Sequence, residues 1–387
     1  MTHEEQSTRF EELLQLLSEH GFEGMAEAVQ ILMNEAMKLE RAEVLGATPY
    51  QRTETRRGYA NGFKDKTVNS RLGKLHLKVP QTRDVEFYPS ALERGERCER
   101  ALKLAAAEMY VQGVSTRKVQ EVTQVLCGLD VSSTHVSRAA GLLDEELEKW
   151  RNRPLGQVPY LILDARYEKI RHGGSVIDCA VLVAIGVTPE GKRSILGVSV
   201  SLSEAEVHWR EFLHSLIGRG MHGVQFIVSD AHEGLAAARK ACLAGVAWQR
   251  CQCHLQQNAA HYVPKLDMRK AVAEDLRGVF NAGDRGEAQR LLKIAVDKYA
   301  QTAPRLATWM ETNIPEGLAV FQLPDRHRRR LRTTNMLERL NKEIKRRTRV
   351  ATLFPHEESL LRLVSAVLAE TSEDWETGNN YLAMEAN

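Results

Sequence analysis

The sequence predicts a protein of the mixed α/β class (α/β or α+β), in which an all-helical segment interrupts a sheet-forming core and a mainly helical region precedes it. Between residues 157 and 254, short apolar runs and amphipathic segments follow one another in the order β-β-β-α-β-α-β. From residue 255 to about residue 332, apolar residues recur only at helical spacing. The chain of 387 residues is also too long for one ordinary domain.

The first 150 residues divide into two parts. Residues 1–50 are predicted to be helical, because leucines recur at helical spacing and Gly21 interrupts the run. Residues 51–150 begin with a basic, glycine-punctuated stretch in which apolar and polar residues alternate from Leu75 onward. This alternation predicts a short, half-buried strand that ends at Pro80.

A helix-turn-helix is predicted at the end of this second part. One helix runs to Cys127, Gly128 breaks it, and a second helix begins near Ser132 and continues to about Trp150. The start of the second helix would present short polar side chains to a DNA groove. A plain helical hairpin without a role in DNA binding remains the alternative. The predicted DNA contacts of residues 51–150 are Ser133, Thr134, His135, Ser137 and Arg138, with Arg56 and Arg57 upstream.

The distribution of charge favours a polyanionic partner, although the net charge is only +2. Residues 51–83 contain nine Lys or Arg residues against two acidic residues, and residues 326–349 contain eleven against two. A run of charge usually marks a solvated face, but two clusters this one-sided in a nearly neutral chain indicate nucleic acid. The predicted DNA contacts in the second cluster are Lys342, Lys345, Arg346 and Arg347.

Composition and cysteine usage predict a reduced, cytoplasmic protein. No run of about 18 apolar residues predicts a transmembrane helix. The polar, acidic start of the chain does not have the pattern of a secretory signal. The six cysteines are scattered and form no regular framework. We therefore expect no membrane association and a location at the nucleoid.

Three carboxylates are the candidate catalytic and metal-binding residues. Asp164 and Asp230 each end a predicted apolar strand, and in parallel neighbouring strands they would meet at one edge of the sheet, where ligands of open α/β sheets bind. Glu338 lies on a basic helix predicted from Asn335 to Thr348. Three hard oxygen donors around a cleft can hold two Mg²⁺ ions, which suits phosphodiester chemistry.

Structural roles are the alternative for two of these carboxylates. Asp230 could serve only as the N-terminal cap of the next helix. Asn335 and Glu338 have the spacing of a capping box, so Glu338 could merely close a helix end. Asp164 is harder to explain in this way, because a carboxylate after four largely apolar residues needs a partner. From spacing alone, the catalytic and the structural interpretations both stay open.

A further motif follows the last predicted strand, in the segment Arg250-Cys251-Gln252-Cys253-His254. Cys251 and His254 are three residues apart, like half of a zinc site. No second Cys/His pair lies nearby at ligand spacing, which makes zinc the weaker interpretation. Packing at a strand-to-helix junction, or support of the carboxylate site, is the stronger one.

Together these motifs resemble the mutator-like transposases of bacterial insertion sequences, which are DDE transposases. The similarity extends over nearly the whole chain, from about residue 57 to the C-terminal helix. The motifs are specific only when taken jointly. The segments that carry the resemblance are Leu163-Asp164-Ala165, Val228 to Leu235, Trp248 to Cys251 with His254, Thr333-Thr334-Asn335, and Glu338 to Asn341.

The resemblance implies an RNase H-like catalytic core with a helical insertion between the second Asp and the Glu. It implies that the catalytic, metal-binding trio is Asp164, Asp230 and Glu338, and that the family's Cys-x-x-His signature is Cys251 with His254. It further implies two Mg²⁺ ions, with Mn²⁺ as a substitute, and a homo-oligomer that binds the terminal inverted repeats of an element and its target DNA.

The sequence therefore predicts a DNA transposase that cuts a strand at the end of a mobile element and joins the freed 3′ hydroxyl to another phosphodiester. Two alternatives are a non-enzymatic, sequence-specific DNA-binding regulator and an RNase H-like nuclease without strand transfer. The helical insertion and the basic N-terminal region favour transposition over the bare nuclease. The predicted regions are an N-terminal helical region (1–50), a DNA-binding region (51–150), the first part of the core (157–254), the helical insertion (255–332) and the C-terminal helices of the core (333–387).

Overall fold

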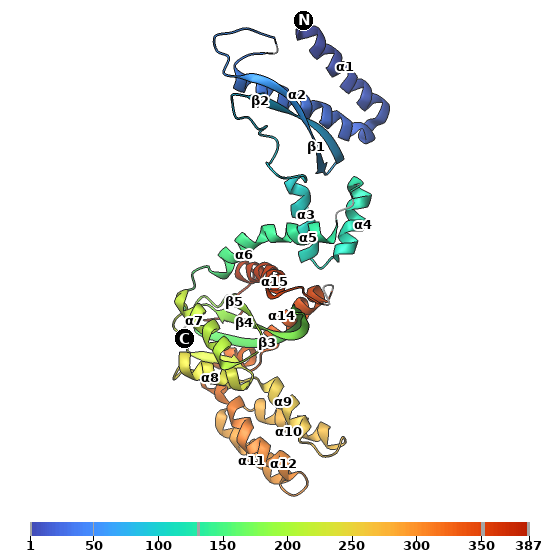
Figure 1. Ribbon diagram of the computed structural model, residues 1–387. Coiled ribbons are helices and arrows are strands. Elements are labelled where there is room, and N and C mark those ends of the chain that lie inside the picture. The colour runs from blue at the N-terminus through green and yellow to red at the C-terminus, as the bar shows by residue number, and fades with distance from the viewer. Residues whose placement is uncertain (1, 49, 130–131, 350–352, 385–387) are drawn as a thin grey trace. The chain divides into compact units, whose positions relative to one another are not determined.

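The computed structural model describes residues 2–48, 50–129, 132–349 and 353–384. The chain divides into two compact units, Met1–Leu143 and Asp144–Asn387, and Figure 1 labels most of their helices and strands. Within the described ranges, no helix combines the length and the apolar character needed to cross a membrane.

The first unit begins with two helices, as predicted. α1 (Thr2–His20) and α2 (Met25–Leu45) are separated by a 3₁₀ turn, η1 (Gly21–Gly24). The turn starts at Gly21, whose φ of +55° lies in the left-handed region that glycine adopts without strain. α2 packs Met37 against Leu75 and Leu77 of the strand that follows.

A two-stranded antiparallel hairpin follows, formed by β1 (Tyr59–Ser70) and β2 (Gly73–Arg83). The sequence does not predict β1, because most of this strand is exposed and its residues lack an apolar alternation. The prediction that β2 ends at Pro80 is wrong. Pro80 lies opposite Phe63, next to an irregularity in the strand register, and a missing backbone N–H is tolerated at such a place.

Three helices complete the first unit: α3 (Arg100–Val111), α4 (Thr116–Cys127) and α5 (Ser133–Ala140). They share a small core that includes Val119, Leu129 and Val136. α4 ends at Cys127, and Gly128 breaks it as predicted. The φ of Gly128 is +62°, in the left-handed region. Residues 130 and 131, between α4 and α5, lie outside the described part of the chain.

The prediction that one helix continues to Trp150 is wrong. α5 ends at Ala140, a 3₁₀ turn, η2 (Gly141–Leu143), follows, and α6 (Asp144–Arg151) begins the second unit. α6 starts with three consecutive acidic residues, which favour a new helix N-terminus at this point because they complement the helix dipole.

The second unit is built on a five-stranded mixed sheet in the order β5-β4-β3-β6-β7. β3, β4 and β5 are antiparallel neighbours, whereas β6 is parallel to β3 and β7 is parallel to β6. The predicted order β-β-β-α-β-α-β is confirmed. The elements are β3 (Tyr160–His172), β4 (Ser175–Val187), β5 (Arg193–Ser201), α7 (Glu206–Gly218), β6 (Phe226–Ser229), α8 (Glu233–Cys242) and β7 (Ala247–Arg250).

The two faces of the sheet pack against different helices. Leu161 and Leu163 of β3 share a core with α7 and α8, where Trp209 is fully buried. Side chains alternate between faces along a strand, so the even-numbered residues of β3 point to the opposite face. That face packs against α14 (Asn335–Thr348) and α15 (Glu357–Thr377). Asp164 therefore lies on the side of the sheet that α14 covers.

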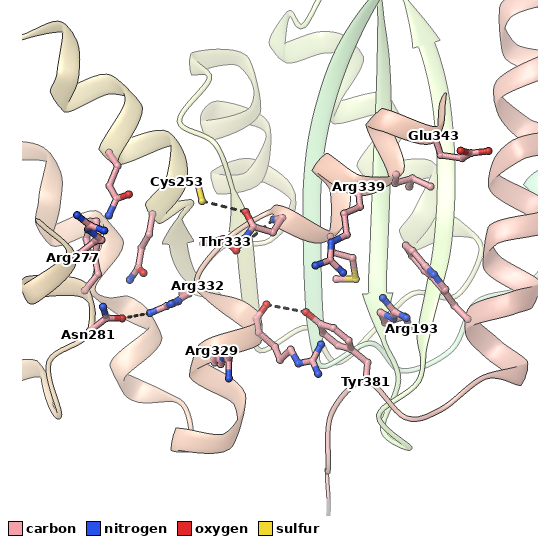
Figure 2. A pocket seen from close by; sticks show the side chains of 18 of the residues that line it. Arg193, Cys253, Arg277, Asn281, Arg329, Arg332, Thr333, Arg339, Glu343 and Tyr381 are labelled. Atoms are coloured by element: carbon pink, nitrogen blue, oxygen red, sulfur yellow. Dashed lines mark hydrogen bonds between the residues drawn. The ribbon is translucent and has the colours of Figure 1, made fainter. Parts of the chain in front are cut away.

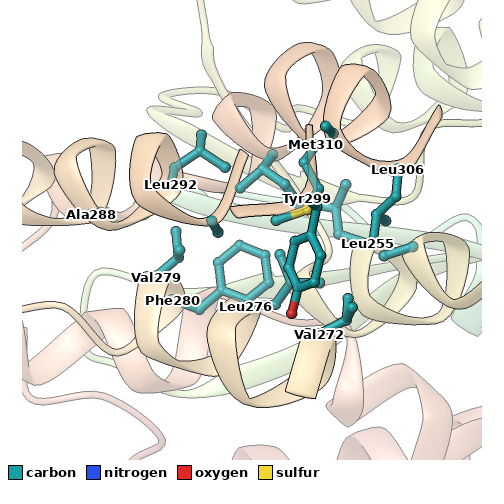
Figure 3. Close-up of a cluster of buried hydrophobic side chains, with 14 of the residues drawn as sticks. Leu255, Val272, Leu276, Val279, Phe280, Ala288, Leu292, Tyr299, Leu306 and Met310 are labelled. Carbon is teal, nitrogen blue, oxygen red and sulfur yellow. The ribbon is translucent and has the colours of Figure 1, made fainter. Parts of the chain in front are cut away.

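The segment between β7 and α14 is helical throughout its regular elements, as predicted, and has its own core (Figure 3). Phe280, Leu292 and Met310 are among the buried residues of this core. Tyr299 joins them and donates a hydrogen bond of 2.6 Å from its hydroxyl to Asp275 Oδ2. The elements are α9 (Gln252–His261), α10 (Met268–Phe280), α11 (Arg285–Tyr299), α12 (Pro304–Asn313), the 3₁₀ turns η3 (Ile314–Gly317) and η4 (Ala319–Gln322), and α13 (Asp325–Leu331).

Candidate active site

Asp164 lies within β3 and not at its end. The prediction that the strand ends at this carboxylate is wrong, because β3 continues to His172 as the antiparallel partner of β4. Its parallel partner β6 nevertheless ends at Ser229. The pairing of Ile162 with Val228 is the last in this ladder, and two residues farther along each chain stand Asp164 and Asp230. The β3–β6 register thus brings the two aspartates to the same level of the sheet.

The Asp164 carboxyl is poorly solvated. Burial raises its pKa to about 7, and the negative charges of Cys251 and Asp230 act in the same direction, whereas the nearby His254 opposes them. Asn341 Nδ2 donates a hydrogen bond of 3.1 Å to Asp164 Oδ2. The partner that the sequence requires for this carboxylate is therefore on α14.

Asp230 follows β6 directly and does not cap the next helix. The residue before α8 is His232, and it makes no side-chain cap. Asp230 Oδ1 instead accepts a hydrogen bond of 2.7 Å from the Ala231 backbone N–H. The same oxygen lies 3.9 Å from His254 Nδ1. This distance is too long for a hydrogen bond, so the contact is electrostatic.

Glu338 lies in the first turns of α14, and the alternative of a capping box is wrong. Thr334, and not Asn335, precedes the helix, and its side chain forms no cap. Glu338 is one turn before Asn341, so the two residues share a face of the helix. Because Asn341 contacts Asp164, this face of α14 is directed toward the aspartates.

Cys251 and His254 follow the end of β7 and lie between it and the start of α14. The Cys251 thiol is fully buried, and both the backbone N–H and the Oγ1 of Thr334 lie 3.3 Å from its Sγ as donors. Hydrogen bonds from Cys253, His254 and Thr334 outweigh burial and hold the pKa of Cys251 well below its usual range. The hydrogen bond to Cys251 raises the pKa of His254 to about 9, and the negative charges of Asp230 and Asp164 act in the same direction. The motif thus contacts the residue that precedes α14 and places the His254 imidazole beside Asp230.

A divalent cation fits the chemistry of these residues, although no three His, Cys, Asp or Glu side chains of the described part form a ready group for a metal ion. Asp164 is a partly buried carboxyl whose negative form is disfavoured, and Asp230 is a like-charged neighbour. A bound cation would offset both unfavourable effects, and carboxylate oxygens are the donors that hard cations prefer.

A second set of contacts joins β3 to α14. Arg166 pairs with Glu168 and donates to the Asn341 carbonyl oxygen. Glu168 Oε1 accepts a hydrogen bond of 3.0 Å from Thr348 Oγ1. The sequence analysis did not identify Arg166 as part of this region. The signal was present, since residues 164, 166 and 168 are polar at every second position.

The basic residues of α14 have two different environments. Lys342, Lys345 and Arg346 are exposed. Arg347 is buried, and its guanidinium is paired with Glu343 at 2.8 Å and with Glu370 of α15 at 2.9 Å. The structure therefore corrects the prediction of a DNA contact for Arg347, because this side chain joins two helices.

Replacing Arg347 with Ala is expected to lower the unfolding free energy by about 2 kcal/mol, because it removes a buried guanidinium together with its ion pairs to Glu343 and Glu370. Arg346→Ala is the matched control. Its exposed side chain also pairs with Glu343, and we expect a change below about 0.5 kcal/mol. Denaturant unfolding would measure both, and equal losses would contradict the distinction between the two arginines.

The predicted DNA contacts of the first unit lie on two elements. Arg57 is exposed, and Arg56 is half-buried with its guanidinium 5.4 Å from the centre of the Tyr59 ring. His135 and Arg138 are exposed on α5. Ser133, Thr134 and Ser137 belong to the same helix.

Comparisons with known proteins point to one family. The family model described as "Transposase, Mutator family" matches residues 1–378. The transposase for insertion sequence element IS406 of Burkholderia multivorans is 58% identical over 368 residues, which is 95% of each chain. The transposase for ISRM5 of Rhizobium meliloti is 43% identical over 364 residues, or 94% of this chain and 91% of the relative.

Two further matches are more distant. The transposase for IS256 in transposon Tn4001 of Staphylococcus aureus is 36% identical over 352 residues, or 89% of each chain. Among solved structures, a chain of the simian T-cell lymphotropic virus intasome in complex with PP2A regulatory subunit B56 gamma aligns with 54% of this chain and 67% of its own. The identity is 14% and the TM-score is 0.17, which is too low to inform the fold.

Proposed function

Because the chain belongs to the Mutator family of transposases, which are DDE-type enzymes, we propose that Asp164, Asp230 and Glu338 are the carboxylates with which it cuts and rejoins DNA at the ends of an insertion element. The observation that carries this proposal is the junction of β3, β6 and α14. The β3–β6 register aligns the two aspartates, and Asn341 joins Asp164 to the helix of Glu338.

The proposed core is RNase H-like, with residues 255–332 as an insertion between the second Asp and the Glu. Its support is the strand order, with three antiparallel strands followed by two parallel strands and with helices on both faces. The remaining proposed regions are the N-terminal helices (1–50), the DNA-binding region (51–150), the first part of the core (157–254) and its C-terminal helices (333–387).

The three carboxylates would hold two Mg²⁺ ions, for which Mn²⁺ could substitute. When bound, such ions activate an attacking oxygen and stabilise a leaving one. The residues of the chain have supporting tasks. Asn341 orients Asp164, and the His254 imidazolium moderates the negative charge of both aspartates.

DNA binding at the element ends is assigned to the first unit. α4 and α5 would act as the helix-turn-helix, with the exposed His135 in the first turn and the exposed Arg138 in the last turn of its second helix, and the basic residues around Arg56 would contact phosphates. Lys342, Lys345 and Arg346 would hold DNA near the carboxylates. We further propose that the protein acts as a homo-oligomer on inverted repeats and target DNA, in the cytoplasm at the nucleoid.

A cleavage assay separates this function from its two alternatives. The full chain is incubated with a labelled element end, a target plasmid and Mg²⁺. A transposase gives a nick at the end of the element and a product in which the end is joined to the target. Binding without nicking would instead identify a DNA-binding regulator, and nicking without joined product would identify a nuclease.

The helix-turn-helix is tested by Arg138→Gln in the full chain. We expect the affinity for element ends to fall about tenfold, because a good base contact contributes about 1–3 kcal/mol of discrimination. The affinity for random duplex should change much less. Gel-shift titration with both DNAs would measure the two effects. Arg285→Gln, an exposed arginine of the helical segment, is the control. An equal loss on both DNAs would assign Arg138 to phosphate contacts only.

A further inference from the structure

A pocket of about 920 Å³ lies beside α14, within the second unit. Its walls come from the helical segment, the end of α13, α14, the start of β5, α15, and Tyr381 after α15 (Figure 2). The volume is that of a ligand site, but the lining is basic and not mainly apolar as in most such sites. Six arginines line it: Arg193, Arg277, Arg329, Arg330, Arg332 and Arg339.

The positive charge of this pocket is not balanced by the protein. Among the described residues, none of the six guanidinium groups forms an ion pair with a carboxylate. Glu343 is the only acidic residue of the lining; it points away from Arg339 in Figure 2 and is bound to Arg346 and Arg347. Like charges this close repel one another, so an anionic ligand would be stabilised in the pocket.

Arg193 shows the effect of this crowding most clearly. Its Nε atom is buried and has no hydrogen-bond partner in the described part of the chain. Burial lowers the pKa of Arg193; the nearby Tyr381 opposes this, and Arg330 and Arg339 lower the pKa further. A buried donor without a partner is unfavourable, and Arg193 lines the pocket with this donor unsatisfied.

Flat side chains accompany the arginines. The Arg193 guanidinium lies 4.4 Å from the centre of the Trp375 ring and 4.9 Å from that of Tyr381, and the Arg330 guanidinium lies 4.9 Å from the Tyr381 ring. Proteins that bind single-stranded nucleic acid without sequence preference combine such a basic groove with aromatic and guanidinium planes on which bases stack.

The pocket also adjoins the carboxylate site. Asn335 and Arg339 of α14 line the pocket, whereas Glu338 and Asn341 lie on the face of the same helix that is directed toward Asp164. Cys253, another residue of the lining, lies 3.2 Å from Asn335 Oδ1 and belongs to the motif that contacts Asp230 through His254. A ligand strand can therefore extend from the pocket to the carboxylates around one helix.

We propose that this pocket binds a short single-stranded stretch of DNA, next to the phosphodiester that is cut or joined. A volume of about 920 Å³ is too small to enclose a duplex, whose major groove alone is about 12 Å wide. A few nucleotides fit, with their phosphates on the arginines and their bases beside Trp375 and Tyr381. The identity of the strand rests on the proposed function, but the binding itself does not depend on catalysis.

The test is a binding measurement on the full chain carrying Asp164→Asn, without divalent metal. A fluorescent oligothymidine of eight nucleotides is titrated by anisotropy over a range of salt concentrations. Unlabelled random duplex is present in excess, so that surfaces for duplex DNA are occupied. The pocket pair is the double variant Arg330→Gln with Arg339→Gln. The control pair is the double variant Arg269→Gln with Arg305→Gln, which changes two exposed arginines outside the pocket.

We expect the pocket pair to weaken binding at least tenfold at low salt. The slope of log K against log[salt] should fall by about 1.4, since each phosphate contact with a single strand contributes about 0.7. The control pair should leave both values unchanged. The double variant Arg330→Lys with Arg339→Lys should restore the slope, because lysine keeps the two positive charges.

Three outcomes would overturn the proposal. The first is that the pocket pair binds the oligothymidine as tightly as the parent does. The second is that the control pair weakens binding as much as the pocket pair does. The third is that the duplex displaces the oligothymidine. Because no cleavage is measured, a wrong assignment of the catalytic carboxylates would leave this result unaffected. Conversely, loss of pocket binding would leave the carboxylate assignment in place.

Discussion

The variant Glu338→Gln is expected to lose strand cleavage at an element end by at least about a thousandfold while it binds that end normally. Gln has nearly the same shape, but it lacks the negative charge that a hard divalent cation requires. The helix should be unaffected, because α14 has no side-chain cap at its N-terminus that this substitution could remove.

Nicking of a labelled element end with Mg²⁺ would measure the loss, and a gel shift would measure binding. Glu311→Gln, an exposed glutamate of α12, serves as the control and should cut like the parent. Substantial nicking by the Glu338 variant would exclude this residue from the metal site. Glu168 would then be the nearest candidate, although it already accepts from Thr348 and pairs with Arg166.

The variant Asp164→Asn is expected to lose cleavage to a similar extent and, without metal, to become more stable at alkaline pH. Burial raises the pKa of Asp164 from 3.8 to about 7, so the folded state holds this proton more tightly than the unfolded chain does. The stability that the protonated carboxyl contributes is complete below pH 3.8 and is lost as the pH rises to about 7. Asn stays neutral and can still accept the hydrogen bond from Asn341.

At pH 8 in EDTA, the unfolding free energy of the Asn variant should therefore exceed that of the parent by about 2 kcal/mol, and near pH 4 the two should agree. All five tryptophans lie between residues 150 and 375, so tryptophan fluorescence in urea reports on the second unit. Asp178→Asn is the control, since Asp178 is exposed beside Lys169. A parent whose stability does not fall between pH 4 and pH 8 relative to the variant would contradict the burial of this charge.

The sheet and its helices could be predicted from sequence because each element has a strong local pattern. The fully buried strands are continuous apolar runs, and the helical segment repeats its apolar residues every three or four positions. β1 could not be predicted in this way, because a hairpin covered on one face needs few apolar residues. Its partner strand and the packing of α2 supply the information that its own sequence lacks.

In the candidate site, too, local sequence patterns predicted some features and not others. The strand before Asp164 was evident, but its continuation to His172 depends on pairing with β4, which no local pattern reveals. The run of basic residues in α14 does not distinguish the exposed Arg346 from the buried Arg347. The ion pair of Arg347 with Glu370, a residue of another helix, appears only in the folded structure.

The two ends of the helical segment are joined to each other at the sheet. The Gln252 backbone N–H donates a hydrogen bond of 3.0 Å to the Arg332 carbonyl oxygen, and Cys251 and Thr334 meet just outside this pair. Residues 252–332 thus leave the core and return to it at one point, as a guest domain does within a host. Beyond His254, which contacts Asp230, such a segment can be lengthened, shortened or exchanged in evolution at little cost in loop-closure entropy and without moving Glu338 relative to the aspartates.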